Sequence, residues 1–332
     1  MGANISHLSK TPPSANPAQP LNSPPDCPLC GSARTVLVFV HKGYPVRECS
    51  RCGHRYAGFQ PAPDHVEDIY GDDYFTGGGA GYPDYTAEAK LLTDAGRRYG
   101  GLLKRDTIVP GRGNNESVGT SCRRPPDDVR RLLEPRLLDV GAAAGFLLQG
   151  YANAGWLGEG IEPNRAMAEY GRRELGQTIH PGTLETVSLN GMFDAVSWVQ
   201  VLAHLPDPVE SFRIADAHTR PGGLWLIETW NAASRTARIL GEAWHEYSPP
   251  SVLHWWKPAV LKRAMEARGY RLRGTGFAQK WIGMGHAQSL VEHKYGRGIP
   301  TKIARLFPKS WKLPYPSEDL FWAVYQKRSS RH

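Results

Sequence analysis

The sequence predicts an α/β fold, a doubly wound and mostly parallel seven-stranded sheet with an antiparallel last strand, preceded by a small cysteine-rich module. From residue 136 onward, short apolar runs alternate with helix-like segments, which is typical of parallel sheets. The first run carries Asp139 near its end and leads into a loop of glycine and alanine alone. Ahead of this run, four cysteines form two Cys-x-x-Cys pairs.

The two Cys-x-x-Cys pairs are separated by eighteen residues, a spacing typical of a four-cysteine zinc site. Each pair forms a tight knuckle that directs two thiolates to one point. Between the pairs, Thr35–Val40 and Tyr44–Glu48 predict a hairpin. Two disulfides are the alternative, but the N-terminus has no export signal. We expect His54 at the surface and a structural zinc ion held in a ribbon by Cys27, Cys30, Cys49 and Cys52.

The strands and helices of the sheet are bounded by turn residues, and Gly155, Gly176 and Gly269 close three of the helices. Strands are expected, in chain order, at Arg136–Val140, Leu157–Ile161, Gln177–His180, Phe193–Val199, Leu224–Glu228, Tyr270–Phe277 and Leu320–Gln326. Helices are expected at Ala87–Leu103, Phe146–Ala154, Arg165–Leu175, Val209–His218 and Pro258–Arg268. A long insertion, about Gln279–Pro316, separates the last two strands.

Composition sets limits on partners and location. The chain has 332 residues and a formal net charge of +8. No apolar run reaches the roughly 20 residues that span a bilayer, so we expect a cytoplasmic protein with no membrane partner. Aromatic residues are not interleaved with the cations between residues 97 and 136, which argues against a nucleic-acid partner. The oligomeric state stays open.

We expect five segments along the chain. These are a disordered leader over residues 1–25, the zinc ribbon over 26–60, a Tyr/Gly-rich cover segment with a helix over 61–105, a disordered insertion over 106–134 and the cofactor-binding domain over 135–328.

The glycine–alanine loop after the first strand indicates which cofactor binds. Dinucleotide folds need Gly-x-Gly-x-x-Gly, because the backbone must approach a pyrophosphate. Ala143 stands where the middle glycine is needed, which disfavours NAD and FAD. S-adenosylmethionine (SAM) has no phosphate and fits better.

Each part of SAM has a partner in the sequence. Asp139 is expected to position the loop and accept from the ammonium group, and Glu162, after the second strand, to accept both ribose hydroxyls. Thr183 and Leu184 follow the third strand beside the adenine, and Gln200 and Val201 follow the fourth, where the methyl group is presented. The expected cofactor-binding residues are Asp139, Gly141, Ala142, Ala143, Gly145, Glu162, Pro163, Thr183, Leu184, Gln200 and Val201.

Several stretches, in this order, resemble the class I SAM-dependent methyltransferases over about Leu137–Trp230. They are Leu-Leu-Asp139-Val-Gly141-Ala-Ala-Ala-Gly145-Phe, Gly160-Ile-Glu162-Pro-Asn, Gly182-Thr-Leu-Glu185 and Arg220-Pro-Gly-Gly223. The front half, with Cys49-x-x-Cys-Gly-His-Arg-Tyr, Tyr70-x-x-x-Tyr-Phe and Tyr82-x-x-Tyr85, is similar to zinc-ribbon-bearing bacterial methyltransferases, some of them from sugar and secondary-metabolite pathways. The resemblance implies a small-molecule methyl acceptor, and it implies that the segment with Tyr74 and Tyr85 folds over the cofactor.

Three histidines are candidates for a general base, which is needed only if the acceptor must lose a proton. His204 follows the fourth strand, where Ala203 stands in place of a glutamate that this family often has. His245 and His254 lie in an aromatic-rich stretch after the fifth strand, which we expect to line the acceptor pocket. Two alternatives stay open at this point. They are a zinc-ribbon binding protein with an inactive methyltransferase-like domain, and an NAD-dependent oxidoreductase.

Overall fold

The computed structural model describes residues 25–71, 88–106, 134–278 and 318–329, the single residues 298 and 308, and the backbone of 280–283 and 312–315. Most of the predicted leader and most of the predicted insertion over 106–134 lie outside the described residues, so both stay predictions. Of the helices in the described part of the chain, none has the length and apolar character needed to cross a bilayer.

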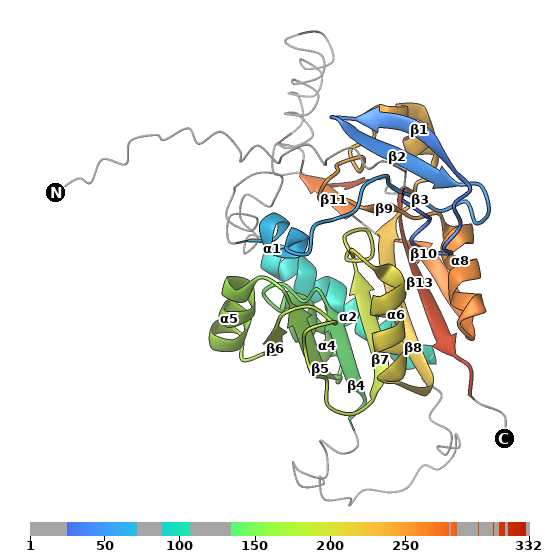
Figure 1. Ribbon diagram of the computed structural model, residues 1–332. Helices are drawn as coiled ribbons and strands as arrows, with labels where there is room; N and C mark the ends of the chain where they lie inside the picture. Colours follow the sequence, from blue (N-terminus) through green and yellow to red (C-terminus); the bar gives the residue numbers. More distant parts are fainter. Residues whose placement is uncertain are drawn as a thin grey trace, which may run out of the picture.

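Seven strands form the central sheet, in the spatial order β10-β13-β8-β7-β4-β5-β6 (Figure 1). Their bounds are β4 (Arg136–Val140), β5 (Leu157–Glu162), β6 (Thr178–Pro181), β7 (Phe193–Val199), β8 (Thr219–Trp230), β10 (Tyr270–Phe277) and β13 (Leu320–Lys327). The strands from β6 to β8 pair in parallel, whereas β13 runs antiparallel to both of its neighbours. The predicted fold class is therefore confirmed.

Helices cover both faces of this sheet (Figure 1). Their bounds are α2 (Ala89–Asp106), α4 (Phe146–Asn153), α5 (Arg165–Glu174), α6 (Pro208–Ala217) and α8 (Pro258–Ala267). Side chains alternate along β7, so that Trp198 packs with residues of α6 and α8 and Ala195 with residues of α2 and α4. A strand that is buried on both faces has a nearly continuous apolar sequence. This is why the bounds predicted for β7 agree with those observed.

Strand β8 is longer than the predicted Leu224–Glu228, since it begins at Thr219. The Pro-Gly-Gly stretch, which lies ahead of the predicted strand, is inside it, and Gly222 has φ 78°. The register with β7 shifts there, because Phe193 pairs with Thr219 and Ala195 already pairs with Leu224. The residues in between form an irregularity in a strand that β7 and β13 hold from both sides, so tertiary pairing overrides the local turn signal.

A second, four-stranded sheet lies above the carboxyl ends of the parallel strands (Figure 1). It has the order β1-β2-β3-β9 and consists of β1 (Thr35–His41), β2 (Tyr44–Cys49), β3 (Arg55–Ala57) and β9 (His254–Trp255). The predicted hairpin is present as β1 and β2. Strands β3 and β9 were not expected from the sequence, and their antiparallel pairing joins the cysteine-bearing segment to the chain that follows β8.

Short elements complete the described structure. They are α1 (His65–Ile69), α7 (Arg235–Leu240), the 3-10 helix η3 (Gly241–Ala243), β11 (Lys280–Gly283) and β12 (Lys312–Tyr315). Strands β11 and β12 form a hairpin within the insertion that the sequence predicts between the last two strands. Helix α1 approaches the same end of the sheet as β9.

Candidate active site

The loop between β4 and α4 is built on three left-handed residues. Gly141, Ala143 and Gly145 have φ values of 72°, 47° and 84°. The amides of Gly141 and Ala142 both donate to the carbonyl of Ile161, at 2.9 Å each. A Cβ on Gly141 would lie 2.9 Å from a methyl group of Val201, so this position has room only for glycine. Ala143 carries a methyl group but has a left-handed φ, which is more usual for glycine.

Glu162 fixes this loop from the neighbouring strand. Its Oε2 accepts from the amide of Ala143 at 2.7 Å, and its Oε1 accepts from the amide of Asn164 at 2.9 Å. Burial raises the pKa of Glu162 to about 7, although both amide hydrogen bonds act in the opposite direction. The carboxylate that we predicted for the ribose is thus already held in place by the protein.

A cavity of about 800 Å³ opens at the carboxyl ends of the strands. The loops after β4, β5, β6 and β7 form one side of it, and α1 with its flanking residues forms another. Of the predicted site residues, the following line this cavity: Gly141, Ala143, Glu162, Pro163, Thr183, Leu184, Gln200, Val201 and His204. The structure thus brings together residues from four separate loops, as expected for a ligand site at the switch point of an open sheet.

Other predicted site residues lie elsewhere. Asp139, Ala142, Gly145, His245 and His254 do not line this cavity. Tyr74 and Tyr85 lie outside the described residues, so their expected place over the cofactor is untested.

Asp139 is buried beneath the loop, and neither of its carboxylate oxygens has a hydrogen-bond partner in the described part of the chain. Burial raises the pKa of Asp139 to about 7, opposed by the nearby Ser197 hydroxyl and reinforced by the charge of Glu162. A buried carboxyl group without a hydrogen-bond partner is costly when it is charged, so Asp139 destabilises the folded protein in its ionised form.

Of the three histidine candidates, His204 borders the cavity, and two polar atoms lie close to its Nδ1. The Tyr70 hydroxyl lies 2.6 Å from Nδ1, and the Ser251 carbonyl oxygen lies 2.8 Å from it. Burial lowers the pKa of His204, helped by the nearby His65 and opposed by the Ser251 carbonyl. The ring therefore stays neutral at pH 7, the state that a base requires.

The other two histidine candidates are placed differently. His254 is buried in β9, where its Nε2 donates toward the Leu205 carbonyl at 2.8 Å and its Nδ1 lies 3.0 Å from His54 Nε2. His245 is half exposed and packs edge-on against Trp230. The expectation of a surface position for His54 is wrong, because the side chain is fully buried among His254, Tyr56 and Trp256.

Three residues that matter for the site, Glu228, Tyr99 and Tyr70, were given no role from the sequence. Glu228 Oε1 accepts from Nε2 of the predicted Gln200 at 2.9 Å, and Gln200 itself has a left-handed φ of 57°. The Tyr99 hydroxyl from α2 donates to the other oxygen of Glu228. Tyr70 closes the cavity from α1. Glu228 and Tyr99 have no local signal, because each acts through a partner distant in sequence. Tyr70 begins the Tyr70-x-x-x-Tyr-Phe stretch of the resemblance, but that stretch assigns it no role of its own.

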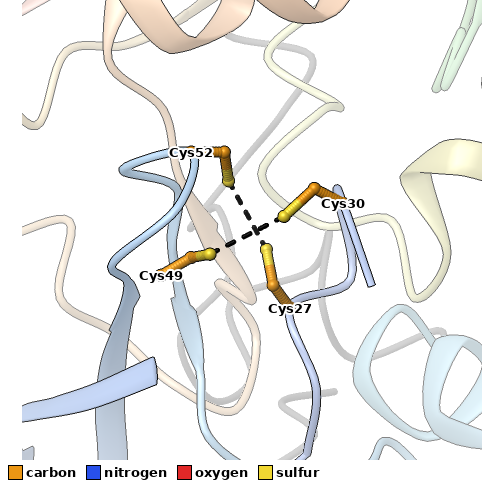
Figure 2. A group of neighbouring side chains, drawn as sticks. All are labelled: Cys27, Cys30, Cys49 and Cys52. Carbon is orange, nitrogen blue, oxygen red and sulfur yellow. Dashed lines mark hydrogen bonds between the residues drawn. The ribbon is translucent and has the colours of Figure 1, made fainter. Parts of the chain in front are cut away.

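Four cysteines form a separate cluster in the N-terminal sheet, and Figure 2 shows their side chains pointing toward one another. The Sγ atoms lie 3.6 Å apart for Cys27 and Cys52 and 3.6 Å apart for Cys30 and Cys49, and all four lie within 4.8 Å of one another. A tetrahedral zinc ion with Zn–S bonds of about 2.3 Å needs sulfur atoms about 3.8 Å apart. A disulfide needs about 2.05 Å. The cluster is therefore consistent with a four-cysteine zinc site.

Comparison with known sequences points to one family. Residues 115–274 match the family described as "Methyltransferase domain". The ubiquinone biosynthesis O-methyltransferase of Haemophilus ducreyi is 28% identical over 165 residues, which cover 42% of this chain and 70% of that protein. The protein of the same name from a Caulobacter species is 32% identical over 132 residues, covering 37% of this chain and 52% of the other.

Two solved structures align with this chain at low similarity. Magnesium protoporphyrin IX methyltransferase from Synechocystis, solved with bound SAH, has 12% identity and a TM-score of 0.44 and covers 75% of this chain and 90% of that chain. The plantazolicin methyltransferase BpumL, also with SAH, has 12% identity and a TM-score of 0.41 and covers 73% and 85%.

Proposed function

Since the chain carries a SAM-dependent methyltransferase domain, we propose that it methylates a hydroxyl oxygen of a small molecule of the sugar or secondary-metabolite type. The observation that carries this proposal is the 800 Å³ cavity, which is lined both by the SAM-type loop and by a neutral histidine. The relatives named ubiquinone biosynthesis O-methyltransferases support oxygen as the methylated atom.

The residues present fit SAM. The carboxylate of Glu162 borders the cavity and is held by two amides, which suits an acceptor for ribose hydroxyls. Thr183 and Leu184 border the same cavity after β6, where the adenine would lie. When bound, SAM supplies an electrophilic methyl group on its sulfonium sulfur.

The protein's own contribution is mainly alignment, because an in-line displacement gains most of its rate from holding the two reactants in position. We assign His204 as the base that takes the proton from the acceptor hydroxyl. Its Nδ1 is occupied by the Ser251 carbonyl and Tyr70, which leaves Nε2 to receive that proton. The buried environment keeps the ring unprotonated until then.

A second cavity, of about 620 Å³, favours entry of the acceptor from the side of the N-terminal sheet. It adjoins the first cavity at Pro206 and Asp207, which line both. Its other walls include Tyr56 and Phe59, from the segment that follows the cysteine knuckles. In the same proposal, zinc in the four-cysteine cluster has a structural role, because four thiolates leave no open coordination position for a substrate.

Calorimetric titration with SAM tests the cofactor. We expect binding to the wild type, and a loss of about 10- to 100-fold in affinity for Glu162→Gln, the range typical of a hydrogen bond to a charged group. Glu210→Gln is the control, since Glu210 pairs with Arg213 on the exposed face of α6. If SAM does not bind the wild type, the domain is an inactive relic; NADH binding instead would favour the oxidoreductase alternative.

Turnover of methyl-labelled SAM against phenols, sugars and other small hydroxyl compounds tests the reaction. His204→Gln is expected to lower kcat at least 100-fold while leaving SAM affinity within about twofold, the pattern of a lost general base. An unchanged kcat in this variant on the true acceptor would remove His204 from the mechanism.

A further inference from the structure

From the contacts of Tyr70 we infer that this residue is a positioning residue, which acts together with the Ser251 carbonyl to hold the proton of His204 on Nδ1 and couples the stability of α1 at the cavity mouth to the bound cofactor. The inference rests on the proposed function, because it concerns the same cavity. It assigns a role to a residue that the sequence analysis mentions only as the start of a tyrosine-rich stretch.

The hydrogen-bond directions at His204 determine which nitrogen carries the proton. The Tyr70 hydroxyl donates to the Ser251 carbonyl at 3.0 Å, and His204 Nδ1 lies 2.8 Å from the same oxygen. A carbonyl oxygen can only accept, so Nδ1 must carry the hydrogen that it shares with this oxygen and with the tyrosine oxygen. In a neutral ring, Nε2 then holds the lone pair.

Tyr70 also packs edge-on against the imidazole. The two ring centroids lie 5.6 Å apart at an interplanar angle of 82°. This contact and the hydroxyl contact come from one side chain, so Tyr70 fixes the rotation of His204 and offers a second acceptor for the Nδ1 hydrogen. Ser251 contributes only a backbone carbonyl, which substitution cannot remove.

The backbone of Tyr70 is held from the cofactor side of the cavity. Asn164 Nδ2 donates to the Tyr70 carbonyl at 2.9 Å, and the Asn164 amide donates to Glu162 at 2.9 Å. The Asn164 side chain also caps α5 by accepting from the Met167 amide at 2.8 Å. A continuous series of contacts therefore runs from Glu162 through Asn164 and Tyr70 to His204.

These contacts link the cofactor side of the cavity, at Glu162, to the side that carries the proposed base, His204. A cofactor hydroxyl bound to Glu162 stabilises the segment that holds the Tyr70 carbonyl, and the Tyr70 hydroxyl then fixes the base. Helix α1, which precedes Tyr70, contributes Val66 and Glu67 to the cavity wall and is stabilised by the same event. The titratable groups that face His204 are His65 and Tyr70 from the α1 side, His254 from β9 and Asp207 ahead of α6.

Nitrogen-15 NMR of the histidine rings in the full-length protein tests the inference without knowledge of the acceptor. With S-adenosylhomocysteine (SAH) bound, the wild type is expected to show His204 protonated at Nδ1, with the signal assigned from its loss in His204→Gln. In Tyr70→Phe, the Nε2-protonated fraction is expected to rise measurably, because one of the two acceptors of the Nδ1 hydrogen is lost while the Ser251 carbonyl still favours Nδ1–H. Tyr247→Phe is the matched control, since it removes a hydroxyl from the nearby aromatic segment that contacts Arg55 rather than His204.

Hydrogen exchange measures the coupling to α1. SAH is expected to slow amide exchange over residues 65–70 about fivefold or more in the wild type, the equivalent of one hydrogen bond, and distinctly less in Tyr70→Phe. Wild-type His204 protonated at Nε2, or an unchanged tautomer and unchanged protection in Tyr70→Phe, would overturn the inference. The wild-type tautomer is informative even if the variant does not fold. Failure of SAH to bind the wild type would instead count against the proposed function.

Discussion

His54 Nε2 and His254 Nδ1 lie 3.0 Å apart inside the protein, although 200 positions separate the two residues in the chain. His54 lies two residues after Cys52, the last of the four clustered cysteines, and His254 begins β9. The same His254 ring reaches the Leu205 carbonyl, one residue from His204 in the cavity wall. A single imidazole thus links the cysteine-bearing segment to the loop that carries the proposed base.

The buried His254 predicts a loss of stability in mild acid. Burial lowers its pKa from 6.5 to about 4, so the folded state binds this proton less readily than the unfolded state does. The stabilisation is fully present above pH 6.5 and is lost as the pH falls toward 4. We expect the unfolding free energy to drop by about 3 kcal/mol over this window, at 1.36 kcal/mol per pKa unit.

Denaturant unfolding at a series of pH values measures this effect. His254→Gln cannot titrate, so its curve is expected to be flatter by the contribution of this one group. Both proteins keep the four cysteines, so the difference between the two curves gives the contribution of His254 without that of cysteine protonation. Parallel curves for the two proteins would contradict the prediction.

The contact between α2 and α4 predicts opposite effects for two glycine-to-alanine substitutions. A Cβ on Gly150 would lie 2.2 Å from the Thr93 carbonyl oxygen and 2.7 Å from the Arg97 amide, both of them backbone atoms that cannot move independently. We expect Gly150→Ala to destabilise the protein by about 2 kcal/mol or more. Gly101 lies in the same pair of helices with nothing within 4 Å of its Cβ position.

Gly101→Ala is therefore expected to be neutral or to stabilise by up to about 1 kcal/mol, the helix-propensity difference. Thermal unfolding of both variants checks the pair. If Gly150→Ala and Gly101→Ala destabilised the protein equally, the close approach of α2 and α4 would not explain the loss of stability.

Asp139→Asn is expected to stabilise the cofactor-free protein at high pH. The folded-state pKa of about 7 is raised from 3.8, so the folded state is favoured below pH 3.8 and loses this advantage as the pH rises through 7. Removing the buried charge is expected to raise the unfolding free energy by about 2 kcal/mol at pH 8. The gain shrinks as the pH is lowered toward 4, and a gain independent of pH would show that the charge is not its cause.

Loss of one metal ligand is expected to weaken cofactor binding at a distance. Cys49→Ser removes a thiolate from the cluster, and we expect metal analysis to find about one zinc per chain in the wild type and much less in the variant. Because β3 pairs with β9, and β9 contacts Leu205, SAM affinity is expected to fall as well. Cys122→Ser, outside both cysteine pairs, is the control. If zinc-free protein bound SAM with full affinity, the prediction would be wrong and the cysteine cluster would have no effect on the cofactor site.

The strands and the cofactor loop could be predicted because their signals are local. Residues such as Val140 and Trp198 lie in apolar runs, and Gly141 sits where a side chain has no room. The pairing of β3 with β9 had no such signal, because β9 is two residues long and its identity depends on its partner. Tyr70 and Glu228 were missed for the same reason: each acquires its role from a residue more than a hundred positions away or across a strand.

The β3–β9 pairing also affects how the N-terminal segment can be cut or exchanged. A chain that begins after residue 60 would leave Trp255 without its partner Arg55 and would expose the edge of a two-residue strand beside the acceptor side of the cavity. Replacing the segment with that of a relative would require transfer of the stretch around His254 as well. In evolution the two stretches are expected to change together, so a family tree built from either should have the same branching order as one built from the other.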